Sequence, residues 1–352
     1  MTDRESRLQD WTRQQLARLH GSKADSVSLL NLSGDASFRR YFRASLADAT
    51  YMAVDSPPET EDNHAFVRIA DVLRKAGVFA PRVLAVDYEQ GFMLQEDFGD
   101  ELYLGVLKQN FDAPDRVDDL YKRAIDALVT LQKHVDTDFL PHYDSQLLHS
   151  EMQLFQDWFC GAFLELELQQ QETQLILDSQ QFLASTALAQ PQVVVHRDYH
   201  SRNLMVPDRD RYPADFIPGV IDFQDAVVGA YTYDLVSLLR DCYISWPLSQ
   251  VQFLALYYKQ QAEDQGVISG ISEAEFFRHF DLMGLQRNLK VIGIFARLCI
   301  RDNKPQFLAD IPQTIRYFTE VAAAYPELQE FLQWFRQRIQ SLADQRLLAG
   351  HS

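Results

Sequence analysis

The first hundred residues show the alternation of apolar and polar positions expected of a small β-sheet. Apolar residues at helical spacing predict a helix over residues 3–20, and a second helix is predicted over residues 63–76. Period-two alternation and short apolar runs predict five strands, at residues 27–32, 38–44, 51–54, 83–86 and 92–94. We therefore expect a small five-stranded antiparallel lobe with one leading helix.

From residue 117 onward, helical periodicity dominates the chain. Helices are predicted at residues 120–134, 151–168, 175–188, 253–265, 273–301, 311–324 and 327–348, and one more begins at Tyr233. Three short strands interrupt this series, at residues 193–195, 204–206 and 219–221. The order of elements predicts an α+β fold with a small lobe over residues 1–98 and a larger, mostly helical lobe over residues 99–352.

The three short strands frame the segment with the strongest chemical signal. A run of valines leads into His-Arg-Asp at residues 196–198, Asn203 follows five residues after Asp198, and Asp222 ends the last strand. Phosphoryl transfer needs a carboxylate to accept the proton of the attacking hydroxyl, and an amide and a second carboxylate to hold Mg²⁺. Asp and Asn also occur at ordinary turns. The fixed spacing in a strand–turn–strand context favours a kinase site.

Composition narrows the partners and the compartment. The 352 residues are 47% hydrophobic and carry a formal net charge of −17, which disfavours nucleic acid or an anionic membrane as the main partner. Three widely spaced cysteines predict neither a disulfide framework nor a zinc site. The charged N-terminal segment lacks the apolar run of a signal peptide, and no stretch reaches the length of a membrane span. We expect a cytoplasmic protein with no obligate protein partner.

The connector between the first two strands is a second candidate for chemistry. It consists of the small residues Ser33, Gly34, Asp35, Ala36 and Ser37. Small residues let backbone N–H groups approach phosphate oxygens, but the same composition suits an ordinary tight turn. Both interpretations stay open on these residues alone.

Several motifs together resemble a known family. The 196–222 segment, the helix start Tyr233-Asp234-Leu235 and the sequence 94–99 resemble the aminoglycoside phosphotransferase and choline kinase-like enzymes, which share the bilobal protein-kinase fold. The resemblance covers most of the chain. It implies ATP and Mg²⁺, with Asp198 as the base and the other two motif residues on the metal. It further implies that adenine is held by the backbone of Gln95, Glu96, Asp97 and Phe98.

Two other stretches narrow the resemblance to a subfamily. Residues 34–43 and 285–295 are similar to bacterial enzymes that phosphorylate the anomeric hydroxyl of N-acetylmuramate and N-acetylglucosamine in cell-wall recycling. Only eleven residues separate Asp222 from Asp234, too few for an activation loop that docks a polypeptide. A small-molecule acceptor is therefore expected. The alternatives are an aminoglycoside or a choline- or homoserine-like alcohol, and a non-catalytic pseudokinase.

One departure from the family concerns the nucleotide phosphates. The family usually has Lys or Arg in the third strand, where this chain has Tyr51–Asp55 without a base. Arg40 on the neighbouring strand is the first candidate to replace it, because a guanidinium can grip phosphate oxygens with two N–H groups. Arg39 and Arg43 are the alternatives, and a solvent-facing role for all three arginines stays open.

A basic helix face suggests where a substrate binds. At 100° per residue, four bases of the helix predicted over residues 273–301 fall within roughly an 80° arc. They are Arg287, Lys290, Arg297 and Arg301. We interpret Arg287 and Lys290 as substrate contacts that would suit a neutral sugar or the lactyl carboxylate of N-acetylmuramate and repel a polycation. The alternative is that these bases pair with carboxylates of the chain.

Overall fold

The computed structural model describes residues 3–21, 27–32, 38–46, 49–208 and 216–349. The chain forms two compact units. The sheet unit comprises the residues up to Val106 together with Arg202–Asp225, and the helical unit comprises Leu107–Ser201 and the chain from Ala226 onward. The predicted α+β class, a five-stranded antiparallel sheet followed by a mostly helical region, is confirmed.

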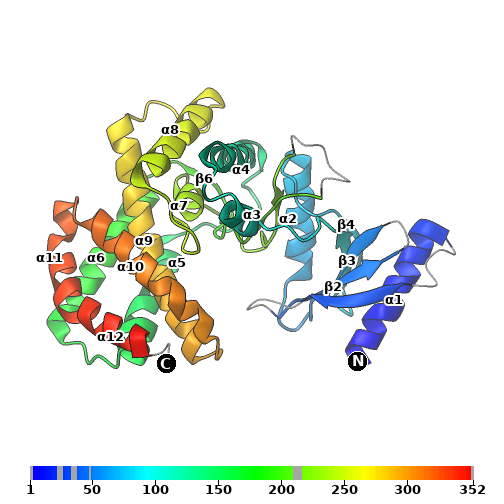
Figure 1. Cartoon of the computed structure of the whole chain (residues 1–352), viewed down its shortest axis with the longest axis horizontal. Coiled ribbons are helices and arrows are strands. Elements are labelled where there is room, and N and C mark those ends of the chain that lie inside the picture. Colours follow the sequence, from blue (N-terminus) through cyan, green and yellow to red (C-terminus); the bar gives the residue numbers. More distant parts are fainter. Residues whose placement is uncertain (1–2, 22–26, 33–37, 47–48, 209–215, 350–352) are drawn as a thin grey trace. The chain divides into compact units, whose positions relative to one another are not determined.

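The sheet unit contains one antiparallel sheet in the order β1-β2-β3-β5-β4. Its strands are β1 (Ser28–Leu32), β2 (Arg40–Ser45), β3 (Thr50–Asp55), β4 (Val83–Asp87) and β5 (Phe92–Glu96). Helix α1 (Asp3–His20) lies along one face of this sheet in Figure 1. Their shared core contains Leu8, Trp11 and Leu16 from α1 and Phe42, Ala44, Ala53, Phe92 and Leu94 from the strands. Helix α2 (Asn63–Lys75) is capped by Asp62, whose side chain accepts from the Ala65 amide at 2.9 Å.

A hairpin far along the chain belongs to the sheet unit. Strands β7 (Leu204–Met205) and β8 (Gly219–Val220) pair with each other. The amide of Val220 donates to the carbonyl of Phe79 at 2.8 Å, and that of Asp208 donates to the carbonyl of Phe98 at 3.2 Å. These bonds attach the hairpin to the segments that flank β4 and β5.

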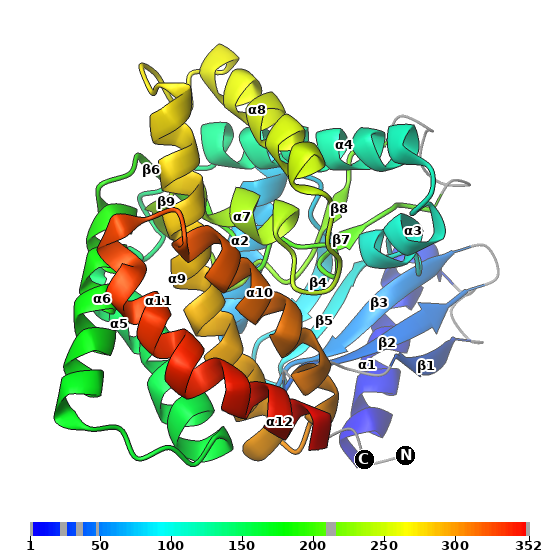
Figure 2. The ribbon, with the colours of Figure 1, turned by 60° about the vertical axis from the view of Figure 1, so that its left-hand side comes forward.

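The helical unit is built around α9 (Glu273–Ile300), which Figure 2 shows among its neighbouring helices. The other helices are α4 (Pro114–His134), α5 (Ser145–Leu154), η2 (Phe155–Phe163), α6 (Gln170–Leu188), α7 (Tyr233–Leu239), α8 (Leu248–Asp264), η3 (Pro305–Asp310), α10 (Ile311–Ala322), η4 (Pro326–Leu328), α11 (Gln329–Trp334), η5 (Phe335–Gln340) and α12 (Ser341–Ala349). Strands β6 (Gln192–Val195) and β9 (Val227–Ala230) form a two-stranded ladder. Short α3 (Tyr103–Gln109) follows the sheet.

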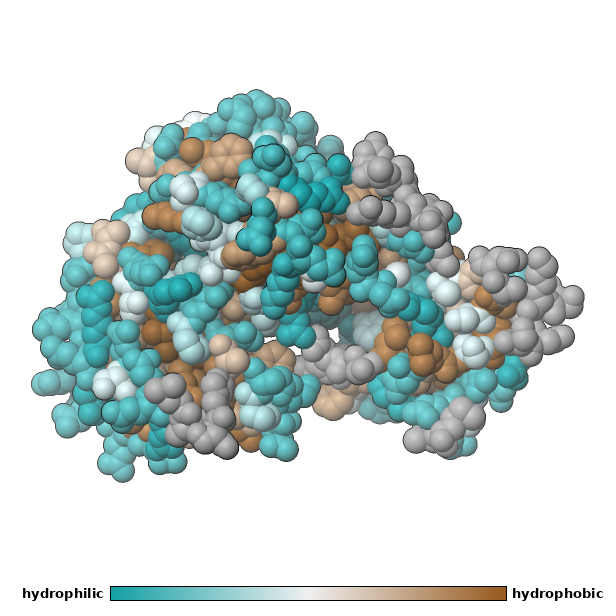
Figure 3. Space-filling model, in the orientation of Figure 1, coloured by the Kyte–Doolittle hydropathy of each residue, from teal (hydrophilic) through white to brown (hydrophobic). Residues whose placement is uncertain are grey.

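Polar residues dominate the face of the molecule seen in Figure 3, with scattered apolar side chains between them. Among the described residues, no helix is both long enough and apolar enough to cross a membrane.

The main helix that the sequence misplaced is the one expected over residues 151–168. It begins earlier, as α5 at Ser145, where the side chain of Asp144 caps it by accepting from the Leu147 amide at 2.8 Å. It continues as a π-helix and ends near Leu164, before Glu165 with a positive φ of 55°. Apolar spacing alone does not locate this start, because the helix opens with the polar residues Ser145 and Gln146, and the signal that marks it is the capping Asp144.

Gly293 marks a close approach between α9 and the α5–η2 junction. A Cβ at this position would lie 2.3 Å from the carbonyl carbon of Leu154 and 2.5 Å from the amide nitrogen of Phe155. We expect Gly293→Ala to lower the free energy of unfolding by about 1–3 kcal/mol, because backbone atoms must move to admit the methyl group. A shift of the urea midpoint to lower concentration would show it. The matched control is Gly105→Ala in α3. An added Cβ at Gly105 would meet no neighbouring atom within 4 Å, and the higher helix propensity of alanine should make the change neutral or stabilising.

Candidate active site

The loop after β6 is held by carboxylates from the segment that follows β9. Asp234, at the start of α7, accepts the backbone amides of His196 at 2.6 Å and Arg197 at 3.0 Å. Asp241 accepts the amide of Ser201 at 3.0 Å and its hydroxyl at 2.5 Å. Arg197 itself has a φ of 76°, a left-handed conformation that a non-glycine residue adopts only when its surroundings enforce it. The loop that carries Asp198 is therefore fixed at both of its ends.

Asp198 stays ionised in these surroundings. Burial alone would raise the pKa of its carboxyl, but the nearby cations of Lys290 and Arg287, together with His200 and His196, outweigh burial and lower it. The residue is only partly exposed. A carboxylate that remains charged at neutral pH and still reaches solvent can accept a proton from a hydroxyl.

A buried ionic cluster adjoins this loop and escaped the sequence analysis. Glu151 of α5 pairs with Arg197 and with Lys290, whose Nζ lies 3.1 Å away, and it accepts the hydroxyl of Tyr143. Lys290 also donates to the hydroxyl of Tyr233 at 2.9 Å. Burial raises the pKa of Glu151, yet the cations of Lys290 and Arg197 reverse the shift and hold it below its usual range. No local pattern marks Glu151, since its partners are far away in the chain.

The predicted metal ligands lie together in the sheet unit. The side-chain amide of Asn203 donates to a carboxylate oxygen of Asp222 at 3.3 Å, and the amide of Ile221 donates to the carbonyl of Asn203 at 3.1 Å. Asp222 is exposed and has a positive φ of 64°. A carboxylate and an amide within hydrogen-bonding distance are hard oxygen donors of the kind Mg²⁺ uses when nucleotide phosphates complete its shell. The described residues therefore fit a Mg²⁺ ion.

The three candidate arginines of β2 and its start differ in their partners. Arg40 gives its Nε and Nη2 to Asp55 at 3.2 and 2.6 Å and its Nη1 to Glu5 of α1 at 2.8 Å. Arg43 is tied to Asp97 at 2.7 Å and to Asp100 at 2.6 Å. The N–H donors of Arg40 and Arg43 are thus used in ion pairs inside the sheet unit.

Arg39 points to the opposite side of the sheet from Arg40. It is 3% exposed and pairs with Glu61 at 2.8 Å. Its guanidinium lies over the ring of Phe66, and the ring centroids of Phe66 and Phe223 are 4.9 Å apart. Burial raises the pKa of the Tyr41 hydroxyl to about 12, and the charges of Arg39 and Asp222 both act on that group. Strand alternation separates Arg39 and Tyr41 from Arg40, so Arg39 is the arginine on the Asp222 side.

We therefore expect Arg39→Ala to raise the KM for ATP by roughly 10- to 100-fold, the effect of losing a charged hydrogen bond to phosphate. Steady-state kinetics at saturating acceptor measures it. Arg40→Ala is the matched variant one residue away, and it should weaken the α1 contact with little change in the KM for ATP. A larger rise of the KM for ATP in Arg40→Ala than in Arg39→Ala would favour Arg40, the phosphate contact that the sequence predicts.

The residues expected at the adenine have mixed surroundings. Gln95 lies in β5 at 3% exposure, and Phe98 stacks on Phe79 with ring centroids 4.4 Å apart. Glu96 accepts from Arg74 at 2.9 Å, and Asp97 accepts the amide of Gly99 at 3.0 Å. These side chains support the segment structurally, so an adenine contact here stays a prediction about its backbone.

The small-residue connector lies outside the described residues. Ser33, Gly34, Asp35, Ala36 and Ser37 are therefore still candidates from sequence alone.

Comparison with known families agrees with this geometry. The family model described as the phosphotransferase enzyme family matches residues 28–269, which include Asp198, Asn203 and Asp222 but not Arg287 and Lys290. The chain belongs to this family. This phosphotransferase is 43% identical over 304 residues to the N-acetylmuramate/N-acetylglucosamine kinase of Pseudomonas aeruginosa, with 86% of each chain covered. It is 41% identical to the enzyme of the same name from Pseudomonas putida, with 94% of this chain and 96% of the relative covered.

Solved structures agree on the fold of the phosphotransferase. It aligns with the streptomycin–ATP ternary complex of the aminoglycoside phosphotransferase APH(2″)-IIa at a TM-score of 0.58 and 13% identity, over 90% of this chain and 99% of the other. The predicted kinase-like fold is thus confirmed.

Proposed function

We propose that this phosphotransferase moves the γ-phosphoryl group of ATP to the anomeric hydroxyl of N-acetylmuramate and N-acetylglucosamine, in the recycling of cell-wall sugars. The observation that carries the proposal is the identity of 41% to 43% to N-acetylmuramate/N-acetylglucosamine kinases along most of both chains. The ATP-bound relative supports the choice of nucleotide.

The residues described above supply the parts of this reaction. The anomeric oxygen attacks the γ-phosphorus while the bond to the bridging oxygen of ADP breaks, and Asp198 takes the hydroxyl proton. Asn203 and Asp222 would hold Mg²⁺, which neutralises phosphate charge when bound. The products are the sugar 1-phosphate and ADP.

An aminoglycoside is the second candidate acceptor. The net charge of −17 would attract a polycation, and the fold is shared with aminoglycoside phosphotransferases. The cations Arg287 and Lys290 near the predicted base Asp198 disfavour it, because they would repel ammonium groups.

A panel assay tests the proposal. ADP release would be measured with both amino sugars, an aminoglycoside, choline and homoserine, and the product phosphate would be located by ³¹P NMR. We expect a phosphorus signal coupled to the anomeric proton with both amino sugars. Turnover of an aminoglycoside with no product from either sugar would contradict the proposal and leave the family membership intact.

A further inference from the structure

Two cations of α9 that lie one turn apart have different surroundings. Lys290 is ion-paired with Glu151 at 3.1 Å and hydrogen-bonded to Tyr233 at 2.9 Å. Arg287 is 3% exposed and makes no hydrogen bond or ion pair with any residue in the part of the chain that the structure describes. The charge of Lys290 is satisfied within the protein, whereas the donors of Arg287 are not.

The carboxylates around Arg287 act on it only at longer range. Burial lowers its pKa, but the charges of Asp198 and Asp241 are among the influences that raise it on balance. The oxygens of Asp241 already accept from Ser201 at 3.0 Å and from the Tyr243 amide at 3.0 Å. A guanidinium has five N–H donors, and at 3% exposure those of Arg287 have little access to solvent acceptors. The carboxylate of a ligand could accept two of these donors.

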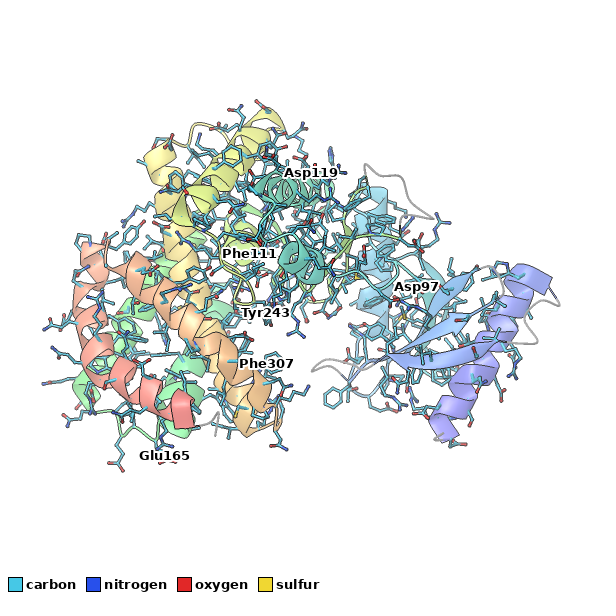
Figure 4. The ribbon with its side chains drawn as sticks, in the orientation of Figure 1. Asp97, Phe111, Asp119, Glu165, Tyr243 and Phe307 are labelled. Atoms are coloured by element: carbon cyan, nitrogen blue, oxygen red, sulfur yellow. The ribbon has the colours of Figure 1, made fainter. Side chains whose placement is uncertain are left out.

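Aromatic side chains of the helical unit pack against His200 of the Asp198 loop. Tyr243 packs edge-on against His200 at 5.3 Å and lies 6.3 Å from Phe295, which stacks on Phe307 at 5.6 Å. Tyr243 and Phe307 are labelled in Figure 4. Aromatic side chains with a few placed polar groups are typical of small-ligand sites. Asp241 connects the two features, because it fixes the Tyr243 amide and also acts on Arg287.

We propose that Arg287 binds the carboxylate of an acidic amino sugar and so favours N-acetylmuramate over N-acetylglucosamine, while Lys290 is a positioning residue that acts through Glu151 and Arg197. A guanidinium can give a carboxylate two parallel N–H bonds, and the neutral sugar offers no such group. The inference rests on the proposed function and divides the two substrate contacts expected from the sequence into separate roles.

Substitution at Arg287 tests the first role. In Arg287→Met, the ratio of kcat/KM for N-acetylmuramate to kcat/KM for N-acetylglucosamine should fall by roughly 10- to 100-fold, the effect of one lost charged pair that only the carboxylated sugar makes. Arg287→Lys should recover part of the loss, because an ammonium keeps the charge without the fork. Arg278→Met is the control on the same helix, since Arg278 pairs with Glu327 at 2.7 Å on the surface, and it should leave both values unchanged.

Substitution at Lys290 tests the second role. Lys290→Met should lower kcat for both sugars alike and lower Tm by several degrees, because Glu151 stays buried with one cation fewer. Arg287→Met should leave Tm unchanged or higher, since it removes a buried charge that has no paired partner. Thermal unfolding thus separates a ligand-binding cation from a structural one.

Two outcomes would overturn the inference in different ways. Equal losses on both sugars in Arg287→Met, with wild-type protein active on each, would reject carboxylate recognition and keep the kinase assignment. Wild-type protein that phosphorylates neither sugar would reject the proposed function and the inference together.

Discussion

Asp198→Asn is expected to abolish turnover and to leave nucleotide binding in place. The substitution removes the carboxylate proposed to accept the hydroxyl proton, and positioned base catalysis contributes about a hundredfold or more to rate. The loop should keep its shape, because Asp234 and Asp241 hold its backbone independently of the Asp198 side chain. Turnover is measured with N-acetylglucosamine as the acceptor, and nucleotide binding is measured by calorimetric titration with ATP.

Asp119→Asn is a suitable control for Asp198→Asn. Asp119, which is labelled in Figure 4, lies on α4 and forms ion pairs with Arg116 and Arg123 at the surface. It should behave as wild type. If Asp198→Asn kept more than about a tenth of the wild-type rate, Asp198 would not be the base.

Asp222→Asn is expected to act on the metal as well as on the rate. The amide that replaces the carboxylate has no charge to offer Mg²⁺, so the Mg²⁺ requirement should rise at least about tenfold and kcat should fall roughly a hundredfold. Asn203→Ala should raise the Mg²⁺ requirement in the same direction, since its amide lies 3.3 Å from Asp222. Mg²⁺ titrations at fixed ATP measure both variants.

Metal-free nucleotide binding separates this role from a general defect. In the presence of a chelator, Asp222→Asn and wild type should bind ATP with similar weak affinity. The surface variant Asp71→Asn, which loses only a pair with Lys75, should titrate as wild type. A Mg²⁺ dependence that does not change in Asp222→Asn would remove this residue from the metal site.

Local sequence patterns predicted the elements of the fold well. The five strands and the long α9 follow from apolar spacing within single segments, and the structure has them within a few residues of the expected bounds. The fixed spacing of Asp198, Asn203 and Asp222 in its strand and turn context predicted phosphoryl transfer, and the family match confirms that class of reaction. The roles of the three residues stay predictions. Short α3 and β9 were not predicted, since seven and four residues give too little periodicity.

Contacts between distant segments could not be predicted in this way. Alternation along the strand predicted over residues 38–44 separates Arg39 from Arg40, but only the packing of α1 shows which side of the sheet Arg40 faces. The partnership of Glu151 with Lys290 joins α5 to α9, which no local pattern encodes. The grouping of Arg202–Asp225 with the first hundred residues depends on backbone bonds such as that from Val220 to Phe79.

The support of the Asp198 loop has a consequence for how this enzyme can change over generations. Asp234 and Asp241 hold backbone amides of His196, Arg197 and Ser201, and every residue except proline has such an amide. The position of the proposed base therefore depends little on which side chains His196 and Ser201 carry, and it depends strongly on Asp234 and Asp241. If the nearby face of α9 binds the acceptor as we propose, mutations there should change the choice of acceptor without disrupting the loop, so a laboratory selection for new sugar acids should vary that face first.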